Sequence, residues 1–158
     1  MAYLRKSFTV KVAAEPPILV GQDEVYGRRQ LIVCPTGTVE GDITGTLLPG
    51  AVDSQVIRPD GTCELSARYA LALDGGGSVY IQNDGIRTVP DEYVEAVKAG
   101  QFVDPNLYYF CTTPRFEVYS RDLDWLTRKV FVCSATRHPD SVEIVYYSVE
   151  QGDEPEAD

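Results

Sequence analysis

Histidine and closely spaced cysteines are scarce in this chain of 158 residues. His138 is the single histidine, and no two of the four cysteines form a CxxC pair. Since a zinc site needs several such ligands at short spacing, we expect no metal site. The GxGxxG, GxxxxGKS/T, GxSxG and HExxH patterns are also missing, which disfavours nucleotide-binding, triad and zinc-protease chemistry. Metal-, nucleotide- and triad-based chemistry are therefore disfavoured together.

Each cysteine lies in an apolar or β-branched context, in stretches such as IVC, YFC and FVC. That context is typical of buried, reduced thiols in a cytosolic protein. The alternative to buried, reduced thiols is that one cysteine is a catalytic nucleophile. His138, however, lies beside a proline in a predicted turn, RHPD, and nothing in the sequence pairs it with Cys34, Cys63, Cys111 or Cys133.

Long apolar runs are absent as well. No segment approaches the roughly 18 uninterrupted apolar residues that a membrane span requires, and the N-terminus has no apolar signal-peptide core. We expect a cytoplasmic protein without a membrane partner. The formal net charge is -10, and the densest basic run is only Arg28-Arg29, so a nucleic-acid partner is not expected either.

The chain has the size and composition of one globular domain. Its apolar content of 44% is ordinary and predicts a sizeable core, and we place the single domain at residues 1–150. The closing QGDEPEAD is polar, contains proline and lacks aromatic side chains. Residues 151–158 are therefore predicted to be a disordered acidic tail.

Strand signals dominate the sequence. Nine stretches are rich in β-branched or aromatic residues, and turn sequences such as PTG, RPDG, DGGG, NDG and HPDS separate them. The predicted strands are 8–12, 30–34, 42–48, 54–57, 64–73, 78–83, 115–119, 129–134 and 142–149. Regular short strands with turns between them favour an antiparallel sandwich or barrel.

The segment 90–100 breaks this pattern. PDEYVEAVKAG begins with a proline and acidic residues, has apolar side chains at Tyr93, Val94 and Val97, and closes with a glycine. These features predict a short amphipathic helix. The helix falls within a long connection between strands, where it either closes one mouth of a barrel or packs on its outside.

The predicted hairpin between residues 50 and 68 is unusually polar for two strands. Its polar set is Asp53, Gln55, Glu64, Ser66 and Arg68. If this set faces inward it forms a site in which Glu64 and Arg68 orient a ligand; if it faces water it is an ordinary sheet surface with a weak ion pair. The other face of the second strand carries Leu65, Ala67, Tyr69, Leu71 and Leu73.

Later strands contain further candidates. Arg87 either pairs with a loop group or binds an anionic or enolate oxygen, and Asn83 lies on the opposite face of its strand from Tyr80. Glu117 follows an aromatic residue; burial would raise its pKa toward the range of a general acid or base, whereas exposure would leave it a solvated strand residue. Trp125 is more often a core anchor than a platform for a ligand.

The order and spacing of seven motifs resemble the DUF3237 family, also called UPF0311. The motifs are YGRR, GTVEG, LPGAVDSQVIRPDGTCELSARY, VYIQNDGIR, YYFCTTPRFE, DWLTRKVFV and HPDSVEIVYYSV, and they run from Tyr26 to Val149. The resemblance implies a compact, oligomeric, antiparallel β-barrel, lipocalin-like in general shape. It also implies a role in specialised-metabolite or aromatic-degradation pathways, by isomerisation, cyclisation or water elimination without a cofactor.

The resemblance also implies site residues. The family's typical polar residues correspond here to Asp53, Glu64, Arg68, Asn83, Arg87 and Glu117. We predict a catalytic set of Asp53, Glu117 and Arg68, and a substrate-binding set of Glu64, Asn83, Arg87, Tyr80 and Trp125. The chain departs from the family pattern at Ser54, where a Trp is usual, at Cys111, where an Arg is usual, and at Cys133, where a Gly is common. Those departures alter the predicted pocket, so the substrate of a relative is not transferred.

Three functions fit the sequence. The first is a cofactor-independent isomerase, cyclase or lyase that acts on a small hydrophobic, polyketide- or aromatic-derived substrate in a barrel pocket. The second is a barrel that binds a small hydrophobic ligand without changing it. The third is a structural oligomer in which the ten tyrosines form interfaces. We favour the enzyme, assembled as a homo-oligomer.

Overall fold

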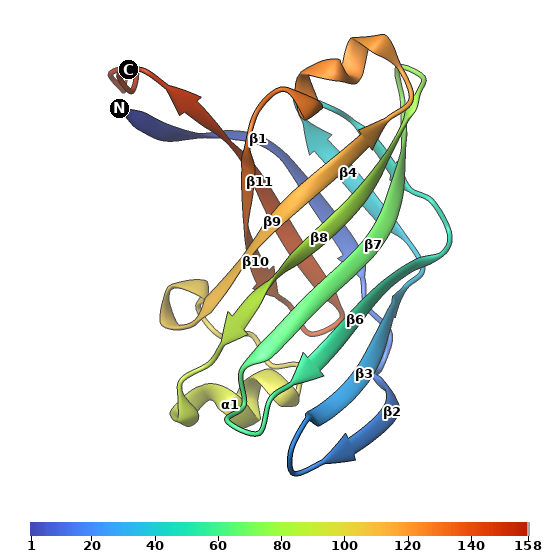
Figure 1. Cartoon of the computed structure of the whole chain (residues 1–158), viewed down its shortest axis with the longest axis vertical. Helices are drawn as coiled ribbons and strands as arrows, with labels where there is room; N and C mark the ends of the chain where they lie inside the picture. The colour runs from blue at the N-terminus through green and yellow to red at the C-terminus, as the bar shows by residue number, and fades with distance from the viewer. Residues whose placement is uncertain (158) are drawn as a thin grey trace.

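Antiparallel strands make up most of the protein. The computed structural model describes residues 1–157 (Figure 1). Its strands are β1 (Ala2–Ala13), β2 (Ile18–Asp23), β3 (Gly27–Cys34), β4 (Gly37–Gly41), β5 (Gly45–Leu47), β6 (Ala51–Ile57), β7 (Cys63–Leu73), β8 (Ser78–Thr88), β9 (Tyr109–Val118), β10 (Phe131–Arg137) and β11 (Ser141–Gln151). The helices are α1 (Asp91–Lys98) and the 3-10 helices η1 (Pro105–Leu107) and η2 (Arg121–Thr127).

The sheet closes on itself into an antiparallel barrel. The ring passes through β7, β5, β4, β1, β11, β10, β9 and β8, and pairing of β7 with β8 closes it. Each strand of the ring therefore has a partner on both sides, which satisfies backbone groups that an open sheet leaves at its edges. The expected all-β barrel is confirmed.

One corner of the sheet extends beyond the ring. β5 and β6 share the same edge of β7, with β5 at its C-terminal end and β6 at its N-terminal end. β6 then pairs with β3, and β3 with β2, which lies at the outside of the sheet (Figure 1). All six residues of β2 are exposed.

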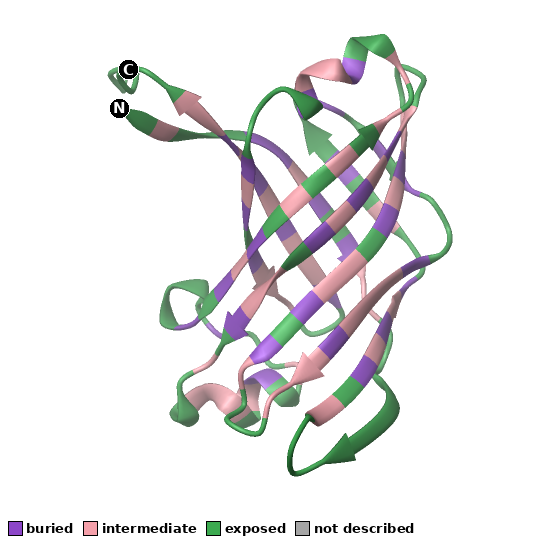
Figure 2. Cartoon of the chain, in the orientation of Figure 1, coloured by how far each residue is buried: buried purple, intermediate pink, exposed green. Residues whose placement is uncertain are grey.

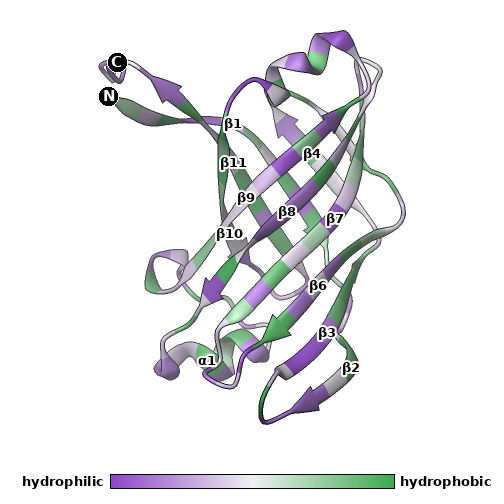
Figure 3. Ribbon diagram, viewed as in Figure 1, coloured by the Kyte–Doolittle hydropathy of each residue, from purple (hydrophilic) through white to green (hydrophobic). Residues whose placement is uncertain are grey.

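Side chains alternate along each strand, so that every second one points into the barrel. Figure 2 shows buried and exposed residues alternating along β7, β8 and β9, and Figure 3 shows the accompanying changes in hydropathy. On β10 the inward positions are Phe131, Cys133, Ala135 and Arg137. The inward side chains thus change from bulky to small, and end on a charged one, along the strand.

Aromatic side chains fill the end of the interior that η2 covers. Phe8 stacks on Tyr146 with ring centroids 4.3 Å apart, and Phe116 meets Phe131 edge-on at 5.1 Å. η2 lies across this end (Figure 1), and its Leu126 is 1% exposed. This half of the barrel is packed core.

The helix predicted over 90–100 is confirmed as α1, which lies at the opposite end of the barrel from η2 (Figure 1). The NDG sequence at 83–85 is not the predicted turn, because β8 continues through it to Thr88. Gly85 is needed there for another reason: a Cβ atom would collide with the Cys111 carbonyl oxygen and with Thr112 on β9. No strand was predicted at β2 or β4 and no helix at η2, and β9 begins at Tyr109 rather than at Arg115.

The two chain ends lie side by side. Ala2 pairs with Gln151, and the Gly152 amide donates to the Met1 carbonyl oxygen at 2.8 Å, so β11 runs just past the predicted domain boundary at 150. Residues 153–157 have no helix or strand, and Asp158 lies outside the described residues, so disorder of the tail stays a prediction. None of the helices within residues 1–157 has the length and apolar character needed to cross a membrane.

Candidate functional site in the open half of the barrel

The half of the barrel away from η2 contains a cavity of about 370 Å³. Its exposed lining residues are Glu15, Pro16, Pro17, Pro139 and Asp140, so it opens between the segment that follows β1 and the turn between β10 and β11. Small side chains, among them Ala67, Thr112 and Ala135, line it where larger ones would fill the barrel. Its volume lies within the range of small-molecule pockets.

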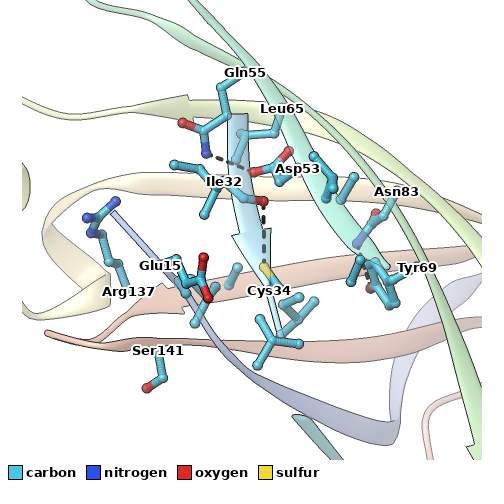
Figure 4. Close-up of a pocket in the computed structure, with 18 of the residues that line it drawn as sticks. Glu15, Ile32, Cys34, Asp53, Gln55, Leu65, Tyr69, Asn83, Arg137 and Ser141 are labelled. Carbon is cyan, nitrogen blue, oxygen red and sulfur yellow. Dashed lines mark hydrogen bonds between the residues drawn. The ribbon is translucent and has the colours of Figure 1, made fainter. Parts of the chain in front are cut away.

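Most of the wall is apolar. The apolar and aromatic lining residues include Val12, Ile32, Leu65, Tyr69, Phe110 and Ile144. A small number of polar side chains interrupt this wall, and Figure 4 shows several of them around the hollow, with Asp53 and Gln55 together, Asn83 beside Tyr69, and Arg137 apart from both pairs. An apolar chamber with a few convergent polar groups suits an organic ligand with a few oxygen atoms.

Asp53 ends a chain of hydrogen bonds along the cavity wall. Arg28 Nε donates to Gln30 Oε1 at 2.9 Å, Gln30 Nε2 donates to Gln55 Oε1 at 2.8 Å, and Gln55 Nε2 donates to Asp53 Oδ2 at 2.7 Å. The second oxygen, Oδ1, accepts from the Ser66 amide at 3.2 Å. A guanidinium group only donates hydrogen bonds, so Arg28 fixes the orientation of the Gln30 and Gln55 side-chain amides. In that orientation Gln55 Nε2 is the donor to Asp53.

Two opposed effects act on the Asp53 carboxyl. Burial raises its pKa above the ordinary aspartate value, because a charged carboxylate loses water there. The hydrogen bonds from Gln55 and Ser66, and then the charge of Arg87, lower the pKa and partly offset this. The net effect raises the pKa of Asp53, which brings this carboxyl closer to the range in which it both accepts and donates a proton.

Asn83 and Thr112 present unused polar atoms. Asn83 is 3% exposed, its Oδ1 has no hydrogen-bond partner among residues 1–157, and its Nδ2 reaches the Tyr69 hydroxyl at 3.5 Å and Cys133 Sγ at 3.9 Å. Thr112 Oγ1 is likewise buried and unpartnered within the described chain. Since a buried polar atom without a partner costs about 1–3 kcal/mol, a ligand that bonds to these atoms recovers part of that free energy.

Two arginines complete the polar lining. Arg87 is 8% exposed and lies over the Phe110 ring, with its guanidinium carbon 5.4 Å from the ring centroid. Arg137, at the end of β10, is half-buried, and its backbone amide donates to the Tyr108 hydroxyl at 3.0 Å. Burial, and then the charge of Arg87, lowers the pKa of Arg137.

Burial of Cys34 and Cys133 disfavours a role for either as a nucleophile. Burial raises the pKa of Cys34, which lines the cavity, to about 11, and that of Cys133 to about 12. Both are therefore thiols rather than thiolates near neutral pH. His138 also lines the cavity, but its ring stacks on Phe102 at 5.6 Å and its Nε2 lies 3.9 Å from a carboxylate oxygen of Glu143.

Comparisons with known proteins agree on one family. The family model described as "Protein of unknown function (DUF3237)" matches residues 3–149. A UPF0311 protein of Clostridium acetobutylicum is 54% identical over 143 residues, covering 90% of each chain. The chain belongs to the DUF3237 family. The resemblance inferred from the motifs is thus confirmed.

Solved structures show the same barrel. A protein of unknown function from C. acetobutylicum, at 51% identity, matches with a TM-score of 0.87 over 95% of this chain and 98% of its own. A protein described as an enzyme from Penicillium herquei matches with a TM-score of 0.70 over 94% and 95% of the two chains. At 15% identity, that second likeness shows that the DUF3237 barrel is shared, and nothing further.

The DUF3237 barrel separates the predicted polar set of the β6–β7 hairpin into two faces. Asp53 pairs across the strands with Ala67, and Gln55 pairs with Leu65, so these four side chains point into the barrel together. Five residues, 58–62, connect Ile57 to its partner Cys63, and this odd number sets the register. The expectation that all five polar residues share a face was wrong.

Five predicted site residues lie away from the cavity. Glu64 and Arg68 are exposed on the outer face, where they bond to Arg58 at 3.1 Å and to Asp84 at 3.4 Å respectively. Glu117 and Tyr80 are cross-strand partners on the outer face of β8 and β9. Glu117 is exposed, so the buried environment expected for a general acid or base is missing. Because inward and outward positions alternate along a strand, none of these four side chains can reach a ligand inside.

Trp125 is the fifth. It belongs to η2 at the packed end, and its ring centroid lies 6.2 Å from that of Phe131. Trp125 is therefore a packing residue rather than part of the cavity wall. Asp53, Asn83 and Arg87 are the predicted site residues that the structure brings into one cavity.

Sequence reasoning missed Arg137, Thr112 and the amide chain from Arg28. A signal for Arg137 was present, since alternation in FVCSATR puts it on the same face as Phe131, Cys133 and Ala135. No comparable signal exists for Gln30 and Gln55, because their contact depends on the pairing of β3 with β6.

Proposed function

We propose that this protein is an enzyme that moves a proton within a small organic substrate held in the open half of the barrel. Asp53 is the proton carrier, Asn83 contacts the reacting oxygen, and Arg87 supplies positive potential nearby. The reaction class is isomerisation, cyclisation or dehydration of a polyketide- or aromatic-derived compound, without a cofactor. Glu117 and Arg68 are not retained as catalytic residues because they lie on the outer face.

The observation that supports this most strongly is the position of Asp53. Its carboxyl lines an apolar cavity, its pKa is raised by burial, and an ordered chain of amides holds it in place. A structural aspartate inside a barrel would be expected to pair with a cation. Among residues 1–157, no Lys or Arg nitrogen lies within 4.0 Å of Asp53.

The proposed step is a proton transfer in two stages. Asp53 removes a proton from a carbon next to a carbonyl group, and the electron pair of the broken C–H bond moves onto the carbonyl oxygen. The charge of Arg87 stabilises that oxygen, and Asn83 Nδ2 donates to it in place of its long contacts with the Tyr69 hydroxyl and Cys133 Sγ. The protonated Asp53 then returns the proton, either to another carbon, which gives an isomer, or to a departing hydroxyl group, which leaves as water.

Non-catalytic binding is the second candidate. The apolar wall and the volume of about 370 Å³ support it equally well. It does not account for a carboxyl with a raised pKa at the end of an oriented amide chain, which is why we place it second. The homo-oligomer and the cytoplasmic location stay predictions; four free cysteines support the latter.

The test is deuterium incorporation. The protein is incubated in D₂O with a small-molecule extract of its host, and mass spectrometry identifies compounds that gain a deuterium or change in mass. We expect such compounds with the wild-type protein and a loss of at least about 10²-fold in their rate of formation with Asp53→Asn. The matched control is Glu117→Gln, because Glu117 is exposed on the outer face of β9.

The outcomes separate the two candidates. If compounds bind, as seen by native mass spectrometry, and are released unaltered by both proteins, the binding barrel is correct and the enzyme proposal fails. If Asp53→Asn forms the products as fast as the wild type, the enzyme proposal fails in its assignment of the proton carrier.

A further inference from the structure

Two guanidinium groups face the same cavity without an acidic partner. Arg87 and Arg137 both line it, and among residues 1–157 no carboxylate oxygen lies within 4.0 Å of either group. Arg137 Nε is buried and has no hydrogen-bond partner in the described chain. Buried arginine is normally paired, because removing its charge from water is costly.

The surroundings of Arg87 and Arg137 concentrate positive charge at one part of the cavity wall. The two arginines come from different strands, and burial together with the neighbouring charge of Arg87 lowers the pKa of Arg137. The Arg87 guanidinium carbon lies over the Phe110 ring, 5.4 Å from its centroid, and this contact does not use the N–H donors of the group. The arrangement therefore holds positive charge and directional donors together at one place.

The carboxylates that line the cavity are engaged or exposed elsewhere. Asp53 accepts from Gln55 and Ser66. Glu15 and Asp140 are exposed at the opening. Neither arginine is therefore in direct contact with a carboxylate of the described chain.

We propose that Arg87 and Arg137 together bind the carboxylate of an organic acid whose apolar body fills the cavity. Two guanidiniums match the two oxygens of a carboxylate by directed, charge-assisted hydrogen bonds. The rest of the cavity wall is mostly apolar. The volume of the cavity equals that of about a dozen water molecules, which suits an aromatic or polycyclic acid. The inference deepens the proposed function and rests on it only in that the same cavity holds the substrate. With an acid as substrate, Arg87 binds the carboxylate, and Asn83 Nδ2 is the donor to the reacting oxygen.

The test uses a matched pair of probes. Isothermal titration calorimetry compares 2-naphthoate with the neutral 2-naphthamide, which has nearly the same shape. We expect wild-type protein to bind the carboxylate at least about tenfold more tightly than the amide. Equal affinity for the two probes, or failure of 2-naphthoate to bind at millimolar concentration, would overturn the proposal without any variant being needed.

Single variants assign the preference to the arginines. Arg87→Gln and Arg137→Gln should each reduce the preference for the carboxylate to about threefold or less, and Arg137→Lys, which keeps the charge, should retain part of it. Arg115→Gln is the control, because Arg115 is exposed on the outward face of β9. Circular dichroism confirms that each variant is folded. An unchanged preference in both folded Gln variants would overturn the proposal.

Asp53→Asn separates this proposal from the proposed catalysis. We expect that variant to keep the carboxylate preference while losing turnover. If turnover does not depend on Asp53 but the preference stands, the catalytic assignment fails and the anion site remains. If turnover depends on Asp53 and 2-naphthoate binds no better than the amide, the anion site fails and the catalytic assignment remains.

Discussion

Gln55 donates a hydrogen bond to Asp53 at 2.7 Å, although both side chains face an apolar cavity. The bond favours the charged carboxylate, while burial disfavours it, and burial is the larger effect on the pKa. Asp53 is thus a carboxyl held in a defined position with its protonation shifted toward the neutral form. The predictions below test that description and the packing that surrounds it.

The first prediction concerns the pH dependence of stability. Because the folded-state pKa of Asp53 is raised above the unfolded value of about 3.9, its contribution to stability is fully present below pH ~3.9 and is lost as pH rises through the folded pKa. Asp53→Asn removes this loss. The free energy of unfolding of the variant, relative to wild type, should therefore increase with pH across that window, measured by urea denaturation at a series of pH values. A difference that does not change with pH would contradict the raised pKa.

The second prediction concerns Arg28, which acts on Asp53 only through the two glutamines. Arg28→Gln removes the donor that fixes the amide directions, so the hydrogen bond to Asp53 should weaken and the pKa of Asp53 should rise further. The measurement is an NMR titration of the Asp53 side-chain carboxyl carbon. Arg29→Gln is the matched control, because Arg29 is exposed on the same strand and should leave the titration unchanged. Equal titration curves in wild type and Arg28→Gln would rule out this positioning role.

The sequence predicts those features of the structure that depend on residues close together in the chain. It does not predict features that depend on how distant strands pair. Strand content, the helix at 90–100 and the family follow from local patterns, and all three are confirmed. The direction of the β6–β7 polar residues depends on a register that one residue shifts, and Asp53 was therefore grouped with Arg68, which faces water. Arg137 joins Arg87 only because β8 and β10 both pair with β9, which no local pattern reports.

The third prediction concerns Tyr146, which is 0% exposed and whose hydroxyl has no partner among residues 1–157. Tyr146→Phe keeps the stacking on Phe8 and removes the unsatisfied hydroxyl, so it should raise the free energy of unfolding by about 1 kcal/mol. Tyr119→Phe, at an exposed site, should change it by less than about 0.5 kcal/mol. Chemical denaturation measures both. Destabilisation by Tyr146→Phe would show that the hydroxyl is satisfied in solution.

The fourth prediction concerns Gly85, where β8 and β9 approach closely at the cavity wall. An added Cβ meets the β9 backbone at Cys111 and Thr112, so Gly85→Ala should lower the free energy of unfolding by about 1–3 kcal/mol. Gly75→Ala is the matched control, because a Cβ there has no heavy atom within 4 Å among the described residues and should have little effect. Similar stability of the two variants would mean that β9 moves aside at little cost.

The most direct test of the central claim compares Asp53 with Glu117, the two carboxyls that the sequence proposed as proton carriers. Initial rates of Asp53→Asn and Glu117→Gln are measured on the compound identified by deuterium incorporation. Since Asp53 lines the cavity and Glu117 is exposed outside it, we predict a loss of at least about 10²-fold for the first variant and a change of less than about twofold for the second. The reverse result, with Glu117→Gln inactive and Asp53→Asn active, would contradict the account.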